Sequence, residues 1–334
     1  MSGKHGESVA ATRRLLVVVG MHRSGTSATT GALQCLGVSL GARLYAGQAG
    51  INPKGYFEHS DIADANDEAL LSIGSGWDDI LPRPDGWWLD PSLAPHGERL
   101  RGIVGREIDK APLFAVKDPR VCRLLAWWHT WLQADGVAPV YLFVVRAPAQ
   151  VCGSLQRRDG FSAAKSQLLW LHHYLEAERA TRGRTRAFLD FSRFLADPVA
   201  EFARVQDTLG FAFPRSPGDA SADLRGFISA DLRHHAGDGA GDRSPYADLA
   251  ARLDAALRGA AQPGGQLDTT EVDAIDDALQ ARLATLPDVA VEQLRDLGRK
   301  RGTFELTVNR LIRSWSYVVG KPVRVVERAL GRNV

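Results

Sequence analysis

The chain has 334 residues and a formal net charge of only +2, with 45% hydrophobic and 24% charged residues. That balance is ordinary for a soluble globular protein with one large domain or two smaller ones. It argues against nucleic acid as a partner, but it is compatible with a local basic pocket for an anionic small molecule. The three cysteines are scattered and lack metal-ligand spacing, which indicates a reducing compartment without disulfides.

The first 13 residues are polar and lack the apolar core of a signal peptide, so we expect them to be disordered. We therefore expect a cytoplasmic protein. Leu15–Val19 is a short, continuous apolar run of the kind found in strands that are buried on both faces of a parallel sheet.

Three further runs of this kind follow, and amphipathic stretches lie between them. Strands that alternate with helices predict an α/β fold, which here means a three-layer P-loop-type parallel sheet with helices on both faces. The turn-rich segment Trp77–Gly97 interrupts the alternation and is expected to form a loop or lid. The other predicted strands are Leu113–Val116, Val140–Val145 and Ala187–Phe191. The predicted helices are Thr26–Leu36, Ser60–Ser72, Arg120–Gln133, Ala149–Gln156 and Ser162–Arg179.

The composition changes after about residue 215, where glycine- and proline-rich breaks appear. We expect an α/β domain over residues 14–235 and a helical C-terminal extension over residues 236–334. Phe304–Leu330 combines apolar residues with regularly spaced arginine and lysine, as a basic amphipathic helix pair would. Such a pair would either pack on the core with its arginines in solvent or touch an anionic membrane at its inner face.

The segment between the first predicted strand and the helix that follows has the features of an anion site. It reads Gly20-Met21-His22-Arg23-Ser24-Gly25-Thr26-Ser27. Backbone N–H groups at a helix N-terminus and the helix dipole favour a negative charge there. The spacing of Gly20 and Gly25 is that of a nucleotide-triphosphate P-loop, but Thr26 stands where such a loop has lysine. The loop therefore suits a phosphate that carries a transferable group other than the γ-phosphate of ATP.

A second anion site is indicated near the third predicted strand. Arg146 follows Val140–Val145 directly, and Ser154 lies eight residues later in the next predicted helix. Together the two side chains could bind a second phosphate remote from the first. The alternative is a salt-bridged arginine and an ordinary helix serine.

Taken together, these two motifs resemble those of the sulfotransferases that use 3′-phosphoadenosine 5′-phosphosulfate (PAPS). Gly20–Ser27 resembles their 5′-phosphosulfate loop and Val145–Ser154 their 3′-phosphate motif, over roughly residues 14–215. Arg23 stands where many members have lysine, which suggests a bacterial, carbohydrate-sulfotransferase-like branch. The resemblance implies PAPS as co-substrate, no metal, and the following cofactor-binding residues: His22, Arg23, Ser24, Gly25, Thr26, Ser27, Arg146, Ser154 and, in a loop that could close over the nucleotide, Arg233.

The candidate catalytic residues lie in two places. Glu58 is the first choice for the base that deprotonates the acceptor, because related carbohydrate sulfotransferases have a glutamate in a similar place, and His59 is the second. Both could instead cap the helix that starts near Ser60. Lys117 ends a predicted strand and would contact the sulfuryl group, while Asp118 would orient it or serve as base. The alternative is a purely structural ion pair.

The sequence thus predicts sulfuryl transfer to an acceptor hydroxyl, on a carbohydrate or glycan. One alternative is a P-loop small-molecule kinase, which the missing lysine disfavours. Another is a non-catalytic, membrane-associated scaffold of a glycan-assembly system, which the two intact motifs disfavour. The oligomeric state is left open.

Overall fold

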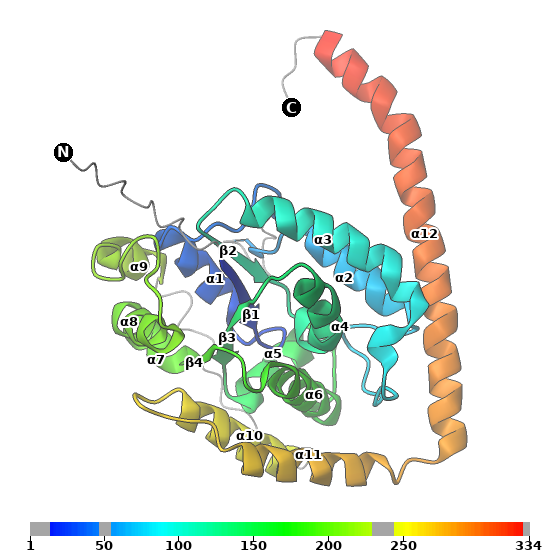
Figure 1. The fold of residues 1–334 in the computed structure, drawn as a ribbon. Helices are drawn as coiled ribbons and strands as arrows, with labels where there is room; N and C mark the ends of the chain where they lie inside the picture. The colour runs from blue at the N-terminus through cyan, green and yellow to red at the C-terminus, as the bar shows by residue number, and fades with distance from the viewer. Residues whose placement is uncertain (1–13, 47–54, 229–243, 330–334) are drawn as a thin grey trace, which may run out of the picture.

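A computed structural model describes residues 14–46, 55–228 and 244–329. Residues 1–13 and Arg233, for which the sequence made predictions, lie outside these ranges. A four-stranded parallel sheet with the order β2-β1-β3-β4 forms the centre of the molecule (Figure 1). Its strands are β1 (Arg14–Val19), β2 (Leu113–Lys117), β3 (Val140–Val145) and β4 (Arg186–Asp190).

The strands are apolar along their middle residues because both faces of the sheet are covered, and their charged residues, such as Arg14 and Lys117, stand at strand ends. In β1, Leu15, Val17 and Val19 belong to one hydrophobic core, and Leu16 and Val18 belong to the other. This is the period of two that a pleated strand imposes. The predicted three-layer α/β architecture is therefore confirmed.

Different helices supply the two cores. One core contains apolar residues of α1 (Thr26–Cys35), α7 (Phe191–Ala196), α8 (Pro198–Leu209) and α9 (Ser221–Phe227). The other contains residues of α2 (Ser60–Ser72), α3 (Ala94–Ile108), α4 (Val121–Ala134), α5 (Pro148–Asp159), α6 (Ala163–Thr181), α10 (Ala247–Ala260) and α11 (Thr269–Leu283). The five predicted helices correspond to α1, α2, α4, α5 and α6.

The segment Trp77–Gly97 is only partly a loop. It contains two short 3-10 helices, η1 (Trp87–Leu89) and η2 (Pro91–Leu93), and α3 already begins at Ala94. Pro95 and Gly97 suggested a break, but proline is tolerated in the first turn of a helix, where its missing N–H costs no hydrogen bond.

The C-terminal part consists of α10, α11 and the long helix α12 (Asp288–Ala329). Leu253 of α10 and Ile275 of α11 are fully buried in the same core as α6, and Arg258 pairs with Asp190 at the end of β4. α12 packs against α2 and then extends past the rest of the molecule (Figure 1). None of the described helices combines the length and the apolar character needed to cross a membrane.

The expected pair of helices after Phe304 was wrong, because α12 is one helix from Asp288 to Ala329. This helix begins well before Phe304, and its first part includes Gly298 and Gly302. A side chain on either glycine would collide with the backbone of Gly74 or Leu71. They therefore allow close packing of α12 on the end of α2.

Candidate functional site

The loop between β1 and α1 is tightly curled. Arg23 and Gly25 have positive φ angles of 69° and 90°. A side chain at Gly25 would overlap the ring of Phe191, so glycine is required there for space as well as for conformation. Thr29 N donates the first α-helical bond to Gly25 O, so the N–H groups of the preceding first turn point out of the helix end. That arrangement suits an anion.

The position of the P-loop lysine is filled by a buried residue. Thr26 is only 3% exposed, and its methyl group lies so close to Gly20 that a side chain on Gly20 would not fit. The loop therefore offers backbone donors and hydroxyl groups, without a lysine on its helix side.

On the β3 side of this loop, three predicted residues lie together. Arg23 Nε donates to Ser154 Oγ at 2.7 Å, and Arg146 Nη1 donates to the carbonyl of Arg23 at 3.0 Å. The Arg146 guanidinium also lies over the ring of Phe191, 5.2 Å from its centroid. The side chain of Arg23, expected on the first phosphate, thus lies with the second group, because the left-handed backbone of Arg23 turns it toward α5.

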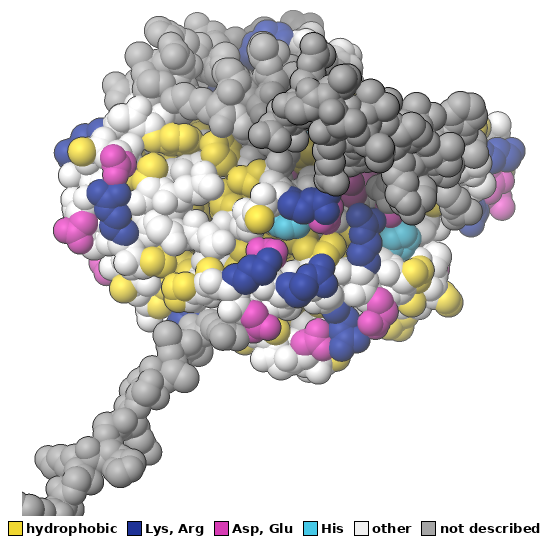
Figure 2. Space-filling model, turned by 90° about the horizontal axis from the view of Figure 1, so that it is seen from above, with side chains coloured by type: hydrophobic (Ala, Val, Ile, Leu, Met, Phe, Trp, Pro, Cys, Tyr) yellow, Lys and Arg dark blue, Asp and Glu magenta, His cyan; other side chains and the backbone are white. Residues whose placement is uncertain are grey.

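We call Arg23, Arg146 and Ser154 the β3-side cluster. Its two arginine side chains are partly buried, and their positive charges repel each other. Burial and then the charge of Arg23 lower the pKa of Arg146 to about 10. Burial and then the charge of Arg158 lower the pKa of Arg23. A bound anion would offset both effects. Seen from above, Lys and Arg side chains gather in the middle of the face of the molecule, although the net charge is only +2 (Figure 2).

On the β2 side of the loop, Lys117 joins the loop to Glu58. Its side chain is 3% exposed, and its Nζ donates to Ser27 Oγ (3.0 Å), to the Tyr56 carbonyl (3.1 Å) and to Glu58 Oε1 (2.6 Å). We call Ser27, Glu58 and Lys117 the β2-side cluster. It places a carboxylate and an ammonium group directly beside the first turn of α1.

Asp118 is linked to this cluster through Arg120. Its Oδ2 accepts from Asn66 at 2.8 Å, and its Oδ1 accepts from Arg120 Nη1 at 2.9 Å. Arg120 Nη1 in turn lies 3.9 Å from Glu58 Oε2. The geometry thus gives Asp118 a role in positioning Arg120 and Asn66.

His59 is directed away from Glu58. It forms an isolated antiparallel bridge with Leu44, and its ring lies beside Gly41 and the carboxylate of Glu107. Its Nδ1 is buried without a hydrogen bond, and burial lowers the pKa of the imidazole. His59 is the N-cap residue of α2, but neither its side chain nor that of Glu58 caps the helix.

His22 brings an aromatic group to the loop. Its ring centroid lies 4.3 Å from that of Trp77, which stacks on Phe161 at 5.7 Å. Burial and then the charge of Arg120 lower the pKa of His22 well below 6.5. The imidazole is therefore neutral near pH 7.

The sequence did not point to Trp77, Phe191 or Arg158. Arg158 lies over Trp77 at 5.3 Å and lowers the pKa of Arg23. Arg158 comes four residues after Ser154 and therefore lies on the same face of α5. This spacing could have indicated that Arg158 belongs to the site. Trp77 lies in an irregular segment without any periodic pattern, so nothing comparable marked it.

Within residues 14–46, 55–228 and 244–329, no cluster of three His, Cys, Asp or Glu residues could hold a metal ion. The basic run Arg299–Arg301 lies on α12, where Arg301 Nη1 is 3.7 Å from Asp78 Oδ1.

Comparisons with known proteins give little further guidance. No family profile matches the chain, and no curated protein is similar to it. Among solved structures, it is similar to a sulfotransferase domain from the olefin synthase of Synechococcus PCC 7002, with 14% identity and a TM-score of 0.38. That likeness covers 80% of this chain and 94% of the other. At this level of similarity the function has to be argued from the site itself.

Proposed function

We propose that this protein transfers a sulfuryl group from PAPS to a hydroxyl of an acceptor, on a carbohydrate or glycan. One observation carries the proposal: the phosphate-type loop after β1 is flanked by two different clusters. Lys117 ends β2 and Arg146 follows β3, and these strands pair with β1 on opposite sides. A nucleotide with anionic groups on both its 5′ and 3′ positions fits two such clusters.

The residues present fit such a nucleotide. The N–H groups of the first turn of α1 and the hydroxyl of Ser27 would hold the 5′ end. The β3-side cluster would hold the 3′-phosphate, because arginine donors match phosphate oxygens well. The lowered pKa of Arg146 supports this assignment, since it reflects a partly buried positive charge close to that of Arg23.

PAPS would supply an activated sulfuryl group on a phosphate leaving group. Glu58 would accept the proton of the acceptor hydroxyl as the acceptor oxygen forms its bond to sulfur. As the bond between sulfur and the bridging oxygen breaks, Lys117 would donate a hydrogen bond to that oxygen. The products are a sulfate ester and adenosine 3′,5′-bisphosphate, and the proton remains on Glu58. Asp118 would keep Arg120 beside Glu58.

A kinase reaction with ATP and Mg²⁺ is less well supported. Thr26 is buried in the place of the phosphate-binding lysine, and Lys117 at the end of β2 donates to Glu58 and Ser27.

Calorimetry with adenosine 3′,5′-bisphosphate and with ATP plus Mg²⁺ tests the proposal. We expect the bisphosphate to bind more tightly than ATP, and Arg146→Ala to weaken it strongly. Arg252→Ala, which removes an arginine paired with Glu271 on α11, is the matched control and should bind as the wild type does. A preference for ATP with Mg²⁺, or no binding of the bisphosphate, would refute the assignment.

We also propose a cytoplasmic location, with α12 touching an anionic membrane surface at its inner face. The exposure of Phe304 (69%) supports this idea, since an exposed aromatic side chain beside basic ones suits a membrane interface. Flotation with vesicles containing phosphatidylserine tests it. The full chain should float, and a variant that ends at Thr303 should not; equal flotation of the two would contradict it.

A further inference from the structure

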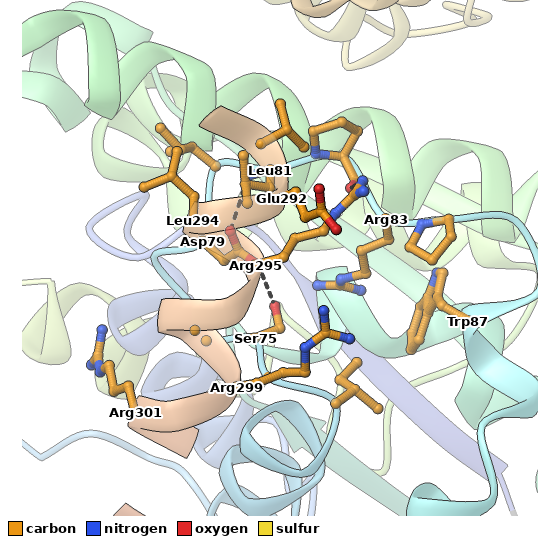
Figure 3. Close-up of a pocket in the computed structure, with 18 of the residues that line it drawn as sticks. Ser75, Asp79, Leu81, Arg83, Trp87, Glu292, Leu294, Arg295, Arg299 and Arg301 are labelled. Carbon is orange, nitrogen blue, oxygen red and sulfur yellow. Dashed lines mark hydrogen bonds between the residues drawn. The ribbon is translucent and has the colours of Figure 1, made fainter. Parts of the chain in front are cut away.

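A cavity of about 830 Å³ lies between α12 and the segment that follows α2 (Figure 3). Arg83 and Trp87 line it from that segment, and Glu292, Arg295 and Arg299 line it from α12. It is lined by neither the loop after β1 nor the two clusters beside it.

Close packing of two glycines shapes this cavity. A side chain at Gly298 would meet the carbonyl oxygen of Gly74 at 2.5 Å, and one at Gly302 would collide with the carbonyl of Leu71. Conversely, a side chain at Gly74 would meet the backbone of Arg299 at 3.1 Å. α12 is therefore fixed against the end of α2 at two points one turn apart, and the cavity opens beside this contact.

Arg83 is a largely buried charged group of the cavity lining. Its side chain is only 7% exposed, and its Nη1 lies 3.5 Å from Glu176 Oε2 and donates to the Arg123 carbonyl. Its Nε and Nη2 are buried and make no hydrogen bond. The same carboxylate also pairs with Arg123 Nε at 2.9 Å, so two guanidinium groups share one carboxylate. Burial and then the charge of Arg123 lower the pKa of Arg83 to about 10.

The other side of the cavity adds positive charge. Arg295 and Arg299 extend from α12 toward the segment that carries Arg83 (Figure 3), and Arg295 Nη2 donates to the Pro82 carbonyl at 3.3 Å. Arg83 also lies over the ring of Trp87, 4.5 Å from its centroid. The cavity thus offers guanidinium groups beside an aromatic face.

The lining also holds five acidic residues, as many as its basic ones, so the preference for an anion depends on where these charges lie. Arg299 Nη2 itself donates to Asp296 Oδ1 at 3.0 Å. Asp78 pairs with Lys165 at 2.9 Å and lies 3.7 Å from Arg301, and Asp79 accepts from Ser75 Oγ and Leu81 N. Asp90 accepts from Ser92 N at the start of η2, and Asp288 and Glu292 are exposed on the first turns of α12.

We propose that this cavity binds the anionic group of the acceptor, a phosphate, sulfate or carboxylate, between Arg83, Arg295 and Arg299, with an adjoining ring of the acceptor against Trp87. The buried, unbonded N–H groups of Arg83 support this, because an anion would supply the acceptor atoms that they lack. That the bound molecule is the acceptor rests on the proposed function, whereas anion binding in the cavity does not.

The position of the cavity agrees with this role. Asp78, which lines it, directly follows Trp77, whose ring contacts His22 in the loop after β1. The cavity and the loop therefore lie on either side of the short segment 76–78. An acceptor anchored by its anionic group in the cavity would extend past this segment toward the loop after β1.

Binding in the cavity can be measured without PAPS, by calorimetric titration with phenyl phosphate at low ionic strength. We expect Arg299→Ala to weaken binding about tenfold, as loss of a charge-assisted hydrogen bond would. Lys300→Ala removes the same charge from the same turn but does not line the cavity, so it should bind as the wild type does. Glu292→Gln should strengthen binding, because it removes a competing carboxylate.

Three outcomes would overturn the site. The first is that phenyl phosphate does not bind, and the second is that Arg299→Ala and Lys300→Ala weaken its binding equally. The third is that only Arg146→Ala abolishes its binding, which would place the ligand in the β3-side cluster. None of them depends on whether the protein binds adenosine 3′,5′-bisphosphate, so failure of the cavity and failure of the proposed transfer are distinguishable.

The acceptor role is tested by comparing glucuronic acid with glucose, and glucose 6-phosphate with glucose, as acceptors for PAPS. The acidic sugars should be preferred, and Arg299→Ala should abolish the preference while Lys300→Ala retains it. Equal use of neutral and acidic sugars by the wild type would overturn the acceptor role even where phenyl phosphate binds.

Discussion

The two clusters beside the loop after β1 differ in how their charges are balanced. In the β2-side cluster, Lys117 donates to a carboxylate, Glu58, at 2.6 Å. In the β3-side cluster, Arg23 and Arg146 donate to neutral oxygens, those of Ser154 and of the Arg23 carbonyl, and burial and like charges lower the pKa values of both arginines. Lys117 of the first cluster thus pairs with a carboxylate, whereas two like charges lie together in the second.

This difference suggests that the β2-side cluster serves the chemical step and the β3-side cluster serves nucleotide binding. A carboxylate next to an ammonium group can accept a proton while the ammonium stabilises charge on a leaving group, which affects the rate of a reaction. A concentration of positive charge stabilises a bound anion before and after reaction alike, which affects affinity. Variants on the two sides should therefore separate turnover from nucleotide binding.

The largest effect is expected for Glu58→Gln. The amide cannot take the proton of the acceptor, so turnover should fall about a thousandfold. Its affinity for adenosine 3′,5′-bisphosphate should stay near that of the wild type. His59→Gln is the control, since this ring lies beside Glu107 and away from Lys117. Release of the bisphosphate from PAPS with a panel of hydroxylated acceptors is the measurement, and equal losses in the two variants would contradict the role of Glu58.

Lys117→Met should reduce turnover about a hundredfold, because one donor to the developing charge is lost. It also leaves Glu58 without its closest partner, so the melting temperature should fall as well. Nucleotide affinity measured well below the melting temperature separates the two effects. If affinity falls as much as turnover does, Lys117 serves binding and the proposed division is wrong.

The opposite pattern is expected for Arg146→Ala. Affinity for adenosine 3′,5′-bisphosphate should fall about thirtyfold, because at least one charge-assisted hydrogen bond is lost. Turnover at saturating PAPS should change much less. Arg146→Lys keeps the charge but not the fork of donors, so it should restore only part of the affinity. A variant that loses turnover but keeps affinity would contradict the assignment.

Most of the fold could be predicted because the sheet is buried on both faces. The four strands are apolar runs with charged residues only at their ends, and glycine or proline stands close to each of them in the sequence. α3 was not predicted, and its first turn was assigned to a loop because Pro95 and Gly97 indicate a break when read locally, although both are tolerated there. The packing of α12 was missed because it depends on the backbone of α2, which is far away in the sequence.

The candidate site was predictable in its residue types but not in its contacts. Glu58 and Lys117 are 59 positions apart, and only the fold brings their charged atoms together. The left-handed backbone of Arg23, with a φ of 69°, helps to set the direction of its side chain, and no local pattern reveals it. The sequence ranked Glu58 above His59, but it could not show that Glu58 contacts Lys117 while the ring of His59 lies beside Gly41.

The smallest expected effect is a change in the pH dependence of stability when His22 is replaced. Charged residues from both sides of the loop after β1 act on this imidazole. After burial, the charges of Arg120 and Lys117 from one side and of Arg158 from the other lower its pKa well below 6.5. The unfolded chain therefore binds more protons than the folded chain below about pH 6.5, and stability falls as the pH falls. One histidine contributes at most about 1.4 kcal/mol per pH unit to this slope. In urea unfolding between pH 7 and 5, His22→Asn should lose less stability on acidification than the wild type does. Equal slopes would show that His22 is not held neutral by its surroundings, and that the charges of the two sides do not converge on it.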